Sequence, residues 1–155
     1  MKQLIEFFFS KKIYGGPLIT KKEIISEITY DWAIKSSKRW VFLKIAASRP
    51  SFLPTSDCLI FSFGDIHECV DASTKLCETI IEYAIDNKNH KVFGEHINKH
   101  FDKWEFRISR ETQMVCIIYL GYNTCGLLFP VKFFEMLSKE LDDITEERKK
   151  MPGKI

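Results

Sequence analysis

The sequence predicts an α+β fold in which two antiparallel β-sheets are each followed by a helix. Three observations support this class. Segments in which apolar and polar residues alternate, as in β-strands, form two groups along the chain. Each group is followed by a stretch whose apolar residues recur at helical spacing. Neighbouring strands followed by a helix favour antiparallel sheets over alternating βαβ units. The chain has 155 residues, of which 45% are hydrophobic, which is enough for one domain with a substantial core.

Strands are expected before the first helix at residues 28–35, 40–48 and 58–63. In the first of them, ITYDWAIK, apolar side chains alternate with polar ones such as Asp31 and Lys35, as in a strand with one buried face. The polar KSSKR separates it from WVFLKIAAS, so the two strands form a hairpin. Upstream, Thr20 and Glu23 have the spacing of a capping box, and a short helix over residues 21–27 is an alternative there.

The first helix is expected to begin at Asp71, a suitable N-cap, and to end near Asp86, because apolar residues recur at helical spacing between them. The second half of the chain repeats this order. Strands are predicted at residues 103–109, 113–123 and 126–129, and a helix at residues 130–148, with Pro130 in its first turn. The expected single domain therefore has two pseudo-equivalent halves, about residues 1–88 and 89–150.

The overall charge is too small to select a partner class. Lys and Arg total 23 against 21 Asp and Glu, a net charge of +2, which is a weak field for nucleic acid or an anionic membrane. The start, MKQLIEFFFSKK, has a short apolar stretch that Glu6 interrupts, unlike a signal peptide. Elsewhere the longest apolar run, Val115–Leu120, is far shorter than the ~20 residues that span a bilayer. We therefore expect a cytoplasmic protein without membrane contact.

The five cysteines give no sign of a cofactor. They lie at positions 58, 69, 77, 116 and 125, with no C-x-x-C pair. An odd count with irregular gaps is a poor disulfide framework and a poor zinc site. A free thiol inside an apolar segment behaves as a small hydrophobe. We expect all five to be reduced and structural, and we expect no cofactor.

The stretch GEHINKHFDKW raises the question of a metal site, because His96 and His100 would share one face of a helix. The metalloprotease pattern H-E-x-x-H needs a Glu beside the first His, where this chain has Ile97. No G-x-S-x-G, Walker or G-x-G-x-x-G pattern occurs. The cluster SFGDIHECVD at 62–71 is typical of a polar loop between a strand and a helix. The sequence therefore predicts no metal, no enzymatic activity and no small-molecule substrate.

Two segments, KRWVFLK and KWEFRISR, interleave aromatic with basic residues, a pattern that single-strand binders use to stack bases and hold phosphates. Binding of nucleic acid through them would use Lys38, Arg39, Trp40, Lys44, Arg107 and Arg110. In the second segment, however, Trp104, Phe106 and Ile108 share one face, as the apolar side of a core strand does. The two interpretations differ in whether the aromatic side chains are exposed.

Two halves that each contain several antiparallel strands and a helix resemble the Whirly and PC4-like binders of single-stranded nucleic acid. The resemblance covers most of the chain and rests on the order of its elements. It implies a pseudo-twofold, Whirly-like arrangement. The Lys-Gly-Lys-Ala-Ala-Leu motif of plant Whirly proteins is absent from this sequence. No nucleic-acid-binding residue is therefore carried over from that family.

Its small size, its Lys- and Ile-rich composition and its lack of catalytic motifs make the chain similar to the immunity proteins of contact-dependent growth inhibition. This resemblance implies that the partner is a cognate toxin C-terminal domain, in the expected case a nuclease. An inhibitor of a basic nuclease cleft would present carboxylates. The candidates are Asp65, Glu68, Asp71, Glu140, Asp142, Asp143, Glu146 and Glu147. For the last five, the alternative is the solvated face of an amphipathic helix.

Overall fold

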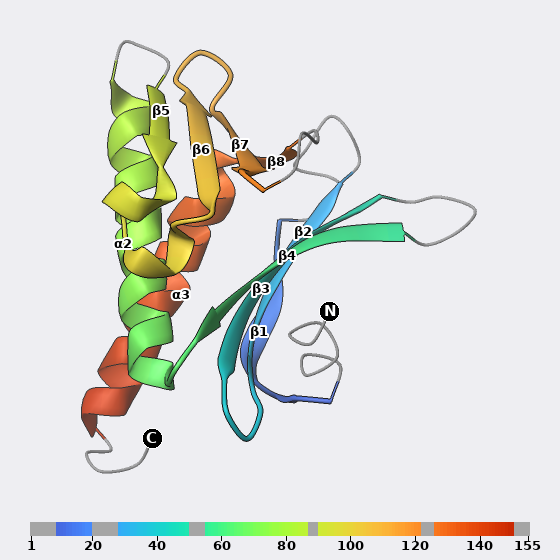
Figure 1. Cartoon of the computed structure of the whole chain (residues 1–155), viewed down its shortest axis with the longest axis vertical. Helices are drawn as coiled ribbons and strands as arrows, with labels where there is room; N and C mark the ends of the chain where they lie inside the picture. The colour runs from blue at the N-terminus through green and yellow to red at the C-terminus, as the bar shows by residue number, and fades with distance from the viewer. Residues whose placement is uncertain (1–8, 20–27, 50–54, 87–89, 122–125, 151–155) are drawn as a thin grey trace. The chain divides into compact units, whose positions relative to one another are not determined.

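The computed structural model describes residues 9–19, 28–49, 55–86, 90–121 and 126–150. It contains two four-stranded antiparallel β-sheets, each followed by a helix (Figure 1). The predicted α+β class is confirmed. No helix in the described part of the chain is long and apolar enough to cross a membrane.

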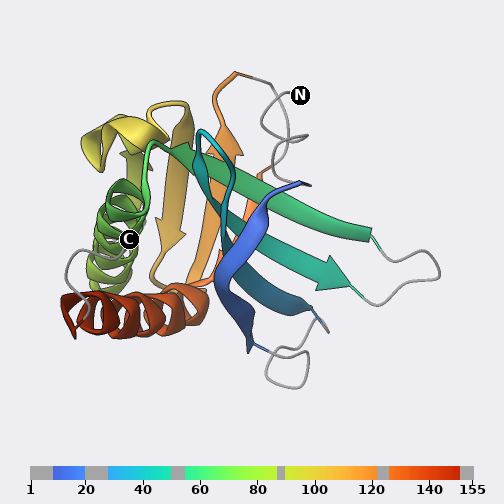
Figure 2. The ribbon, with the colours of Figure 1, turned by 90° about the horizontal axis from the view of Figure 1, so that it is seen from below.

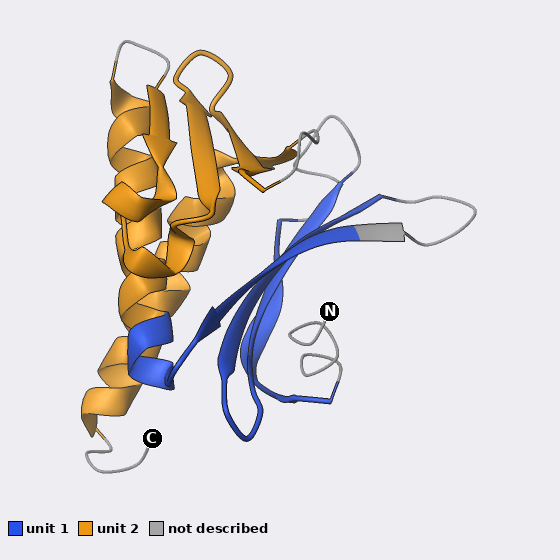
Figure 3. Cartoon of the chain, viewed as in Figure 1, with its two compact units in different colours: residues 1–69 blue, residues 70–155 orange. Residues whose placement is uncertain are grey.

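The chain forms two compact units, residues 1–69 and 70–155 (Figure 3). Unit 1 contains the first sheet and the first four residues of helix α2, which spans Ile66–Ile85. Unit 2 contains the remainder of α2, the second sheet and helix α3, Val131–Lys150. The boundary predicted between the two halves, near residue 88, lies outside the described residues.

The first sheet is a meander with the strand order β1-β2-β3-β4. Its strands are β1 Lys11–Ile19, β2 Thr29–Ser36, β3 Val41–Arg49 and β4 Thr55–Phe63. The last three correspond to the predicted strands, whereas β1 was not predicted. Strand β1 depends on Gly15, which the strand pattern does not indicate. Gly15 has φ +153°, and a Cβ at this position would lie only 2.5 Å from the carbonyl oxygen of Trp32. The short helix at 21–27, considered as an alternative, lies outside the described residues.

The two faces of the first sheet differ in polarity. The alternation predicted for β2 holds, since Tyr30, Trp32 and Ile34 are all buried. They pair with residues of β3 such as Ile45 and Leu43, which are also buried, and this forms the apolar face. The opposite face carries charged side chains and is described below.

Helix α2 begins before the predicted position, and Asp71 is not its N-cap. The Asp65 carboxylate accepts the Glu68 amide at 2.8 Å, so Asp65 is the residue that caps the helix. Glu68 in turn accepts the amide of Gly64 at 2.9 Å. Asp71 lies in the second turn, and it is exposed. The Asp-x-x-Glu spacing at 65–68 resembles a capping box and is the sequence signal for the true start.

The second sheet is also a meander, with the order β5-β6-β7-β8. Its strands are β5 His90–Phe93, β6 Trp104–Ser109, β7 Met114–Tyr119 and β8 Leu127–Pro130. Two short 3₁₀ helices, η2 Gly94–His96 and η3 Lys99–Phe101, connect β5 to β6. Strand β5 was not predicted. Pro130 ends β8 and does not open α3, which begins one residue later.

Helices α2 and α3 lie side by side in unit 2 (Figures 1 and 2). The inner stripe of α3 is buried and consists of Val131, Phe133, Phe134, Leu137, Leu141 and Ile144. The Phe129 ring of β8 lies 5.2 Å from that of Phe133, which links the sheet to α3. The Gln113 side chain donates to the Ala84 carbonyl at 3.0 Å and so ties the β6–β7 turn to α2. The outer faces of both helices are thereby held in fixed positions within this unit.

Candidate functional site

The aromatic residues proposed for base stacking do not form a shared exposed surface. Phe42 and Phe106 are fully buried, with exposed fractions of 0%. Trp104 is half-buried, and its ring meets that of Tyr119 at 5.0 Å in an edge-on arrangement. Trp40 is 38% exposed. A ring must expose a face before a base can stack on it, so Phe42 and Phe106 serve as core residues.

The six residues of the nucleic-acid alternative are split between the units. Lys38, Arg39 and Trp40 lie at the β2–β3 turn of unit 1, and Lys44 lies on β3 of the same sheet. Arg107 and Arg110 belong to unit 2. The Arg107 Nε donates to Glu105 at 2.7 Å, so its charge is already paired with a buried carboxylate. Arg110 is exposed in the β6–β7 turn.

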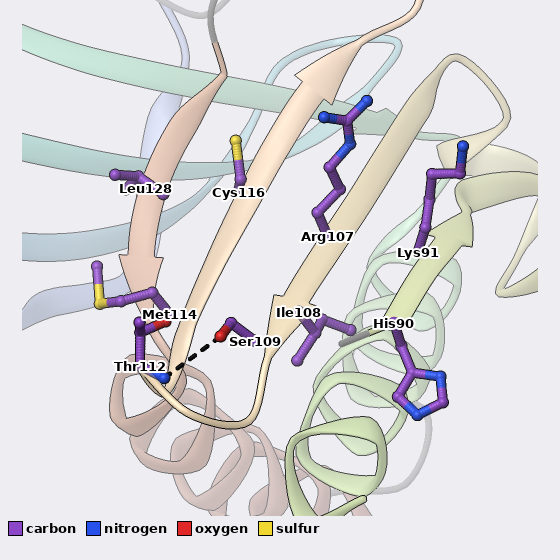
Figure 4. Close-up of a pocket in the computed structure, with 9 residues that line it drawn as sticks. All are labelled: His90, Lys91, Arg107, Ile108, Ser109, Thr112, Met114, Cys116 and Leu128. Carbon is purple, nitrogen blue, oxygen red and sulfur yellow. Dashed lines mark hydrogen bonds between the residues drawn. The ribbon is translucent and has the colours of Figure 1, made fainter. Parts of the chain in front are cut away.

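A pocket of about 360 Å³ lies on the second sheet (Figure 4). Strand register aligns one residue from each strand across its floor, namely Lys91, Arg107, Cys116 and Leu128. In Figure 4 the side chains of Lys91, Arg107 and Cys116 project to the same side of the sheet. Leu128 is 53% exposed, which makes the floor partly apolar. No local sequence pattern indicates this pocket, because it depends on register across four strands.

The polar groups of this pocket make contacts that stabilise the fold. Glu105 is only 5% exposed, and Lys91 Nζ lies 4.0 Å from its carboxylate, opposite the Arg107 contact. His90 Nε2 lies 3.1 Å from an Asp86 carboxylate oxygen but does not make a hydrogen bond. The Ser109 hydroxyl accepts the Thr112 amide at 3.3 Å within the turn. None of these contacts aligns a general base with a nucleophile.

Two acidic residues at the start of α2 cap the helix. Asp65 and Glu68 accept backbone amides at the helix start, as described above. These hydrogen bonds explain why acidic residues occupy both positions, because they cap the helix whether or not a partner binds. Asp71, by contrast, is exposed on the α2 surface in unit 2.

The acidic residues of α3 are grouped and exposed. Glu140, Asp142, Asp143, Glu146 and Glu147 all lie on the solvent side of the helix. Between residues 140 and 147 the chain carries these five carboxylates and no Lys or Arg. Glu146 has an ion pair with Lys149 at 3.5 Å, and both side chains are mostly exposed, so solvent screens it. We call residues 140–147 the acidic segment of α3.

Helices α2 and α3 each carry an acidic side chain that acts on the buried Cys77 thiol. Burial first, and then the carboxylates of Glu78 and Asp142, raise the pKa of the Cys77 thiol well above its usual range. Two acidic side chains from neighbouring helices therefore act on the same buried atom. Glu78 is itself exposed. Glu78 is not among the residues predicted from the sequence, because no local pattern relates a residue of α2 to one of α3.

This environment predicts which thiols react in the folded protein. Cys69 and Cys77 are buried, whereas Cys58 and Cys116 are partly exposed, and all four are free. A thiolate is the reactive form, and burial disfavours it. At pH 8 we expect iodoacetamide to modify Cys58 and Cys116 at least about tenfold faster than Cys77, as followed by peptide mass spectrometry. Modification of Cys77 at the rate of Cys116 in native buffer would contradict this packing, and urea provides the fully reactive control.

The histidine pair does not form on a helix. His96 belongs to η2 and His100 to η3, so they do not have the i, i+4 geometry of a continuous helix. His96 Nε2 lies 3.9 Å from a Glu95 carboxylate oxygen, and both side chains are largely exposed. No group of three or more His, Cys, Asp or Glu side chains that could hold a metal ion occurs within the described ranges.

No protein-family model matches this chain, and no curated protein matches it in sequence. The charge and exposure of the surfaces described above therefore carry the functional proposal.

Proposed function

We propose that this protein is an immunity protein that binds a cognate toxin domain and neutralises it, with the acidic segment of α3 at the interface. The observation that carries the proposal is the group of five exposed carboxylates within residues 140–147. The partner of such a surface is a protein that presents a basic surface. The phosphate-binding cleft of a nuclease has that chemistry.

The inner side of α3 supports this role physically. Phe134, Leu137 and Leu141 are fully buried, with exposed fractions of 0%, so the helix cannot rotate without losing its core contacts. The carboxylates are therefore held in place before a partner arrives, which reduces the entropy lost on binding. Complementary charge also speeds encounter and fixes the register of the complex.

The test of binding uses purified components. The expected partner is the C-terminal region encoded by the neighbouring upstream reading frame, co-expressed with this protein and purified through a tag on one of them. We expect a stable complex whose association slows as salt rises, because charge attraction steers the encounter. Two proteins that elute separately at low salt would contradict the proposal.

Single-stranded nucleic acid is the second candidate partner, and one observation favours it. Within the described residues 9–19 and 28–49, the only acidic residue is Asp31, whereas seven residues are basic. They are Lys11, Lys12, Lys35, Lys38, Arg39, Lys44 and Arg49. Phosphate contacts by this sheet would make affinity fall steeply with salt. Titration of a labelled single-stranded oligonucleotide across a salt series measures this, and the immunity proposal expects no binding at physiological salt.

A further inference from the structure

A second pocket, of about 250 Å³, lies on the charged face of the first sheet in unit 1. Its charged lining comes from three adjacent strands: Lys12 on β1, Asp31 and Lys35 on β2, and Lys44 on β3. Lys12 pairs directly with Lys35, and Lys44 pairs with Ala33, between Asp31 and Lys35. Side chains of paired residues share a face, so the sheet itself gathers these four groups.

The described residues that line this pocket carry more positive than negative charge. Three of them are lysines and one is an aspartate, which together give +2 when all four are ionised. Burial, and then the charges of Lys44 and Lys12, lower the pKa of Lys35. Burial raises the pKa of Asp31, although Lys44 and Lys12 act in the opposite direction. Like charges are thus crowded into a partly desolvated space, and an anion placed there would reduce their repulsion.

The size and the lining of the pocket select the kind of anion. A volume of about 250 Å³ is below the roughly 300–1,000 Å³ of sites for drug-sized ligands. Trp32 lines the pocket but is only 4% exposed, so it offers no open ring face for a nucleobase. A phosphate monoester carries nearly two negative charges at neutral pH, which matches the charge of the lining.

We propose that this pocket binds a phosphoryl dianion, either inorganic phosphate or the phosphate group of a compact ester, through the ammonium groups of Lys12, Lys35 and Lys44. Lysine binds phosphate as a point charge with three rotatable donors, which suits contact from three strands. The Asp31 carboxylate offsets part of the positive charge of Lys12 and Lys44, and it repels the ligand. This site lies in unit 1 and is independent of the proposed binding of a toxin by α3.

The test is isothermal titration calorimetry on the full chain with sodium phosphate at constant ionic strength, with chloride as the reference anion. We expect Lys35→Gln and Lys44→Gln each to weaken phosphate binding by about tenfold or more. Asp31→Asn removes the repelling carboxylate, so we expect it to bind phosphate more tightly than the wild type does. Lys38→Gln, in the β2–β3 turn outside the pocket, is the matched control and should bind as the wild type does.

Two further ligands define what is recognised. If ribose 5-phosphate binds as tightly as phosphate does, the ligand is the free phosphoryl group. If it binds more tightly, the ligand is an ester. Both results support the proposal. Dimethyl phosphate, a monoanion, should bind more weakly than either. The proposal is overturned if phosphate does not bind to the wild type, if Lys35→Gln and Lys44→Gln bind it normally, if Asp31→Asn fails to tighten binding, or if dimethyl phosphate binds equally well.

Discussion

Reversal of four charges in the acidic segment of α3 is expected to weaken the toxin complex by about 100-fold or more. The variant replaces Asp142, Asp143, Glu146 and Glu147 by Lys, and all four positions are exposed. The effect arises because a surface that attracts a basic partner becomes one that repels it, so association slows and the docked charges are no longer paired. Surface plasmon resonance at low and physiological salt separates the two contributions.

The fold should tolerate this reversal. The new lysines lie toward the C-terminal end of α3, where positive charge interacts favourably with the helix dipole. Repulsion from neighbouring Lys and Arg side chains offsets that gain by a few tenths of a kcal/mol per pair. Circular dichroism should therefore give a wild-type spectrum and a similar midpoint of thermal unfolding.

A control variant of equal charge change makes the result specific. It reverses four exposed acidic residues outside the two helices, namely Asp57, Glu95, Asp102 and Glu111. If the acidic segment of α3 forms the interface, this control should lose much less affinity than the α3 variant. Equal losses from the two variants would mean that only the overall charge matters, and the proposed interface would be wrong.

Replacement of Gly94 by Ala is expected to lower the free energy of unfolding by about 3 kcal/mol or more. Gly94 is buried where β5 runs into η2, and its carbonyl accepts the amides of Ile97 and Asn98 at 2.9 and 3.0 Å. A Cβ there would overlap the Phe101 carbonyl oxygen and lie 2.6 Å from its carbon. Backbone atoms cannot move aside as a flexible side chain can, so the connection must deform.

Gly16→Ala is the matched control for this substitution. A Cβ at Gly16 would meet no atom within 4 Å. We expect a change between zero and a gain of about 1 kcal/mol, because Ala restricts the unfolded chain more than Gly does. Urea unfolding measures both variants. A Gly94→Ala protein as stable as the Gly16→Ala protein would contradict the close approach of η2 and η3.

The elements whose apolar residues recur at a regular spacing were predicted from the sequence. The two strands that were not predicted lack such a spacing. In strand β2, Tyr30, Trp32 and Ile34 are buried as the pattern indicated, and the small Ala33 between them is buried as well. Strand β1 contains the sequence Gly-Gly-Pro, which is typical of a turn. Strand β5 has only four residues, two of them charged or titratable. Both are edge strands in their sheets, where pairing with a neighbour overrides weak local preference.

A candidate surface could be predicted from the sequence only where all its residues lie on one helix or strand. Exposure of the acidic segment of α3 follows from the amphipathic spacing of that helix, and the structure agrees with it. The joint effect of Glu78 and Asp142 on the Cys77 thiol requires that α2 and α3 pack together in unit 2. The gathering of Lys12, Lys35 and Lys44 requires strand register across β1, β2 and β3. Contacts between distant segments are not encoded in any local pattern, so sequence analysis could not find them.

The most direct test of the immunity proposal is bacterial growth with the upstream C-terminal region expressed under an inducible promoter. Wild-type protein supplied from a second plasmid should restore growth. The α3 variant should restore little or none at equal abundance, whereas the control variant should protect nearly as the wild type does. Toxicity that the wild type fails to relieve would contradict immunity. Full protection by the α3 variant would leave immunity in place and contradict the interface on α3.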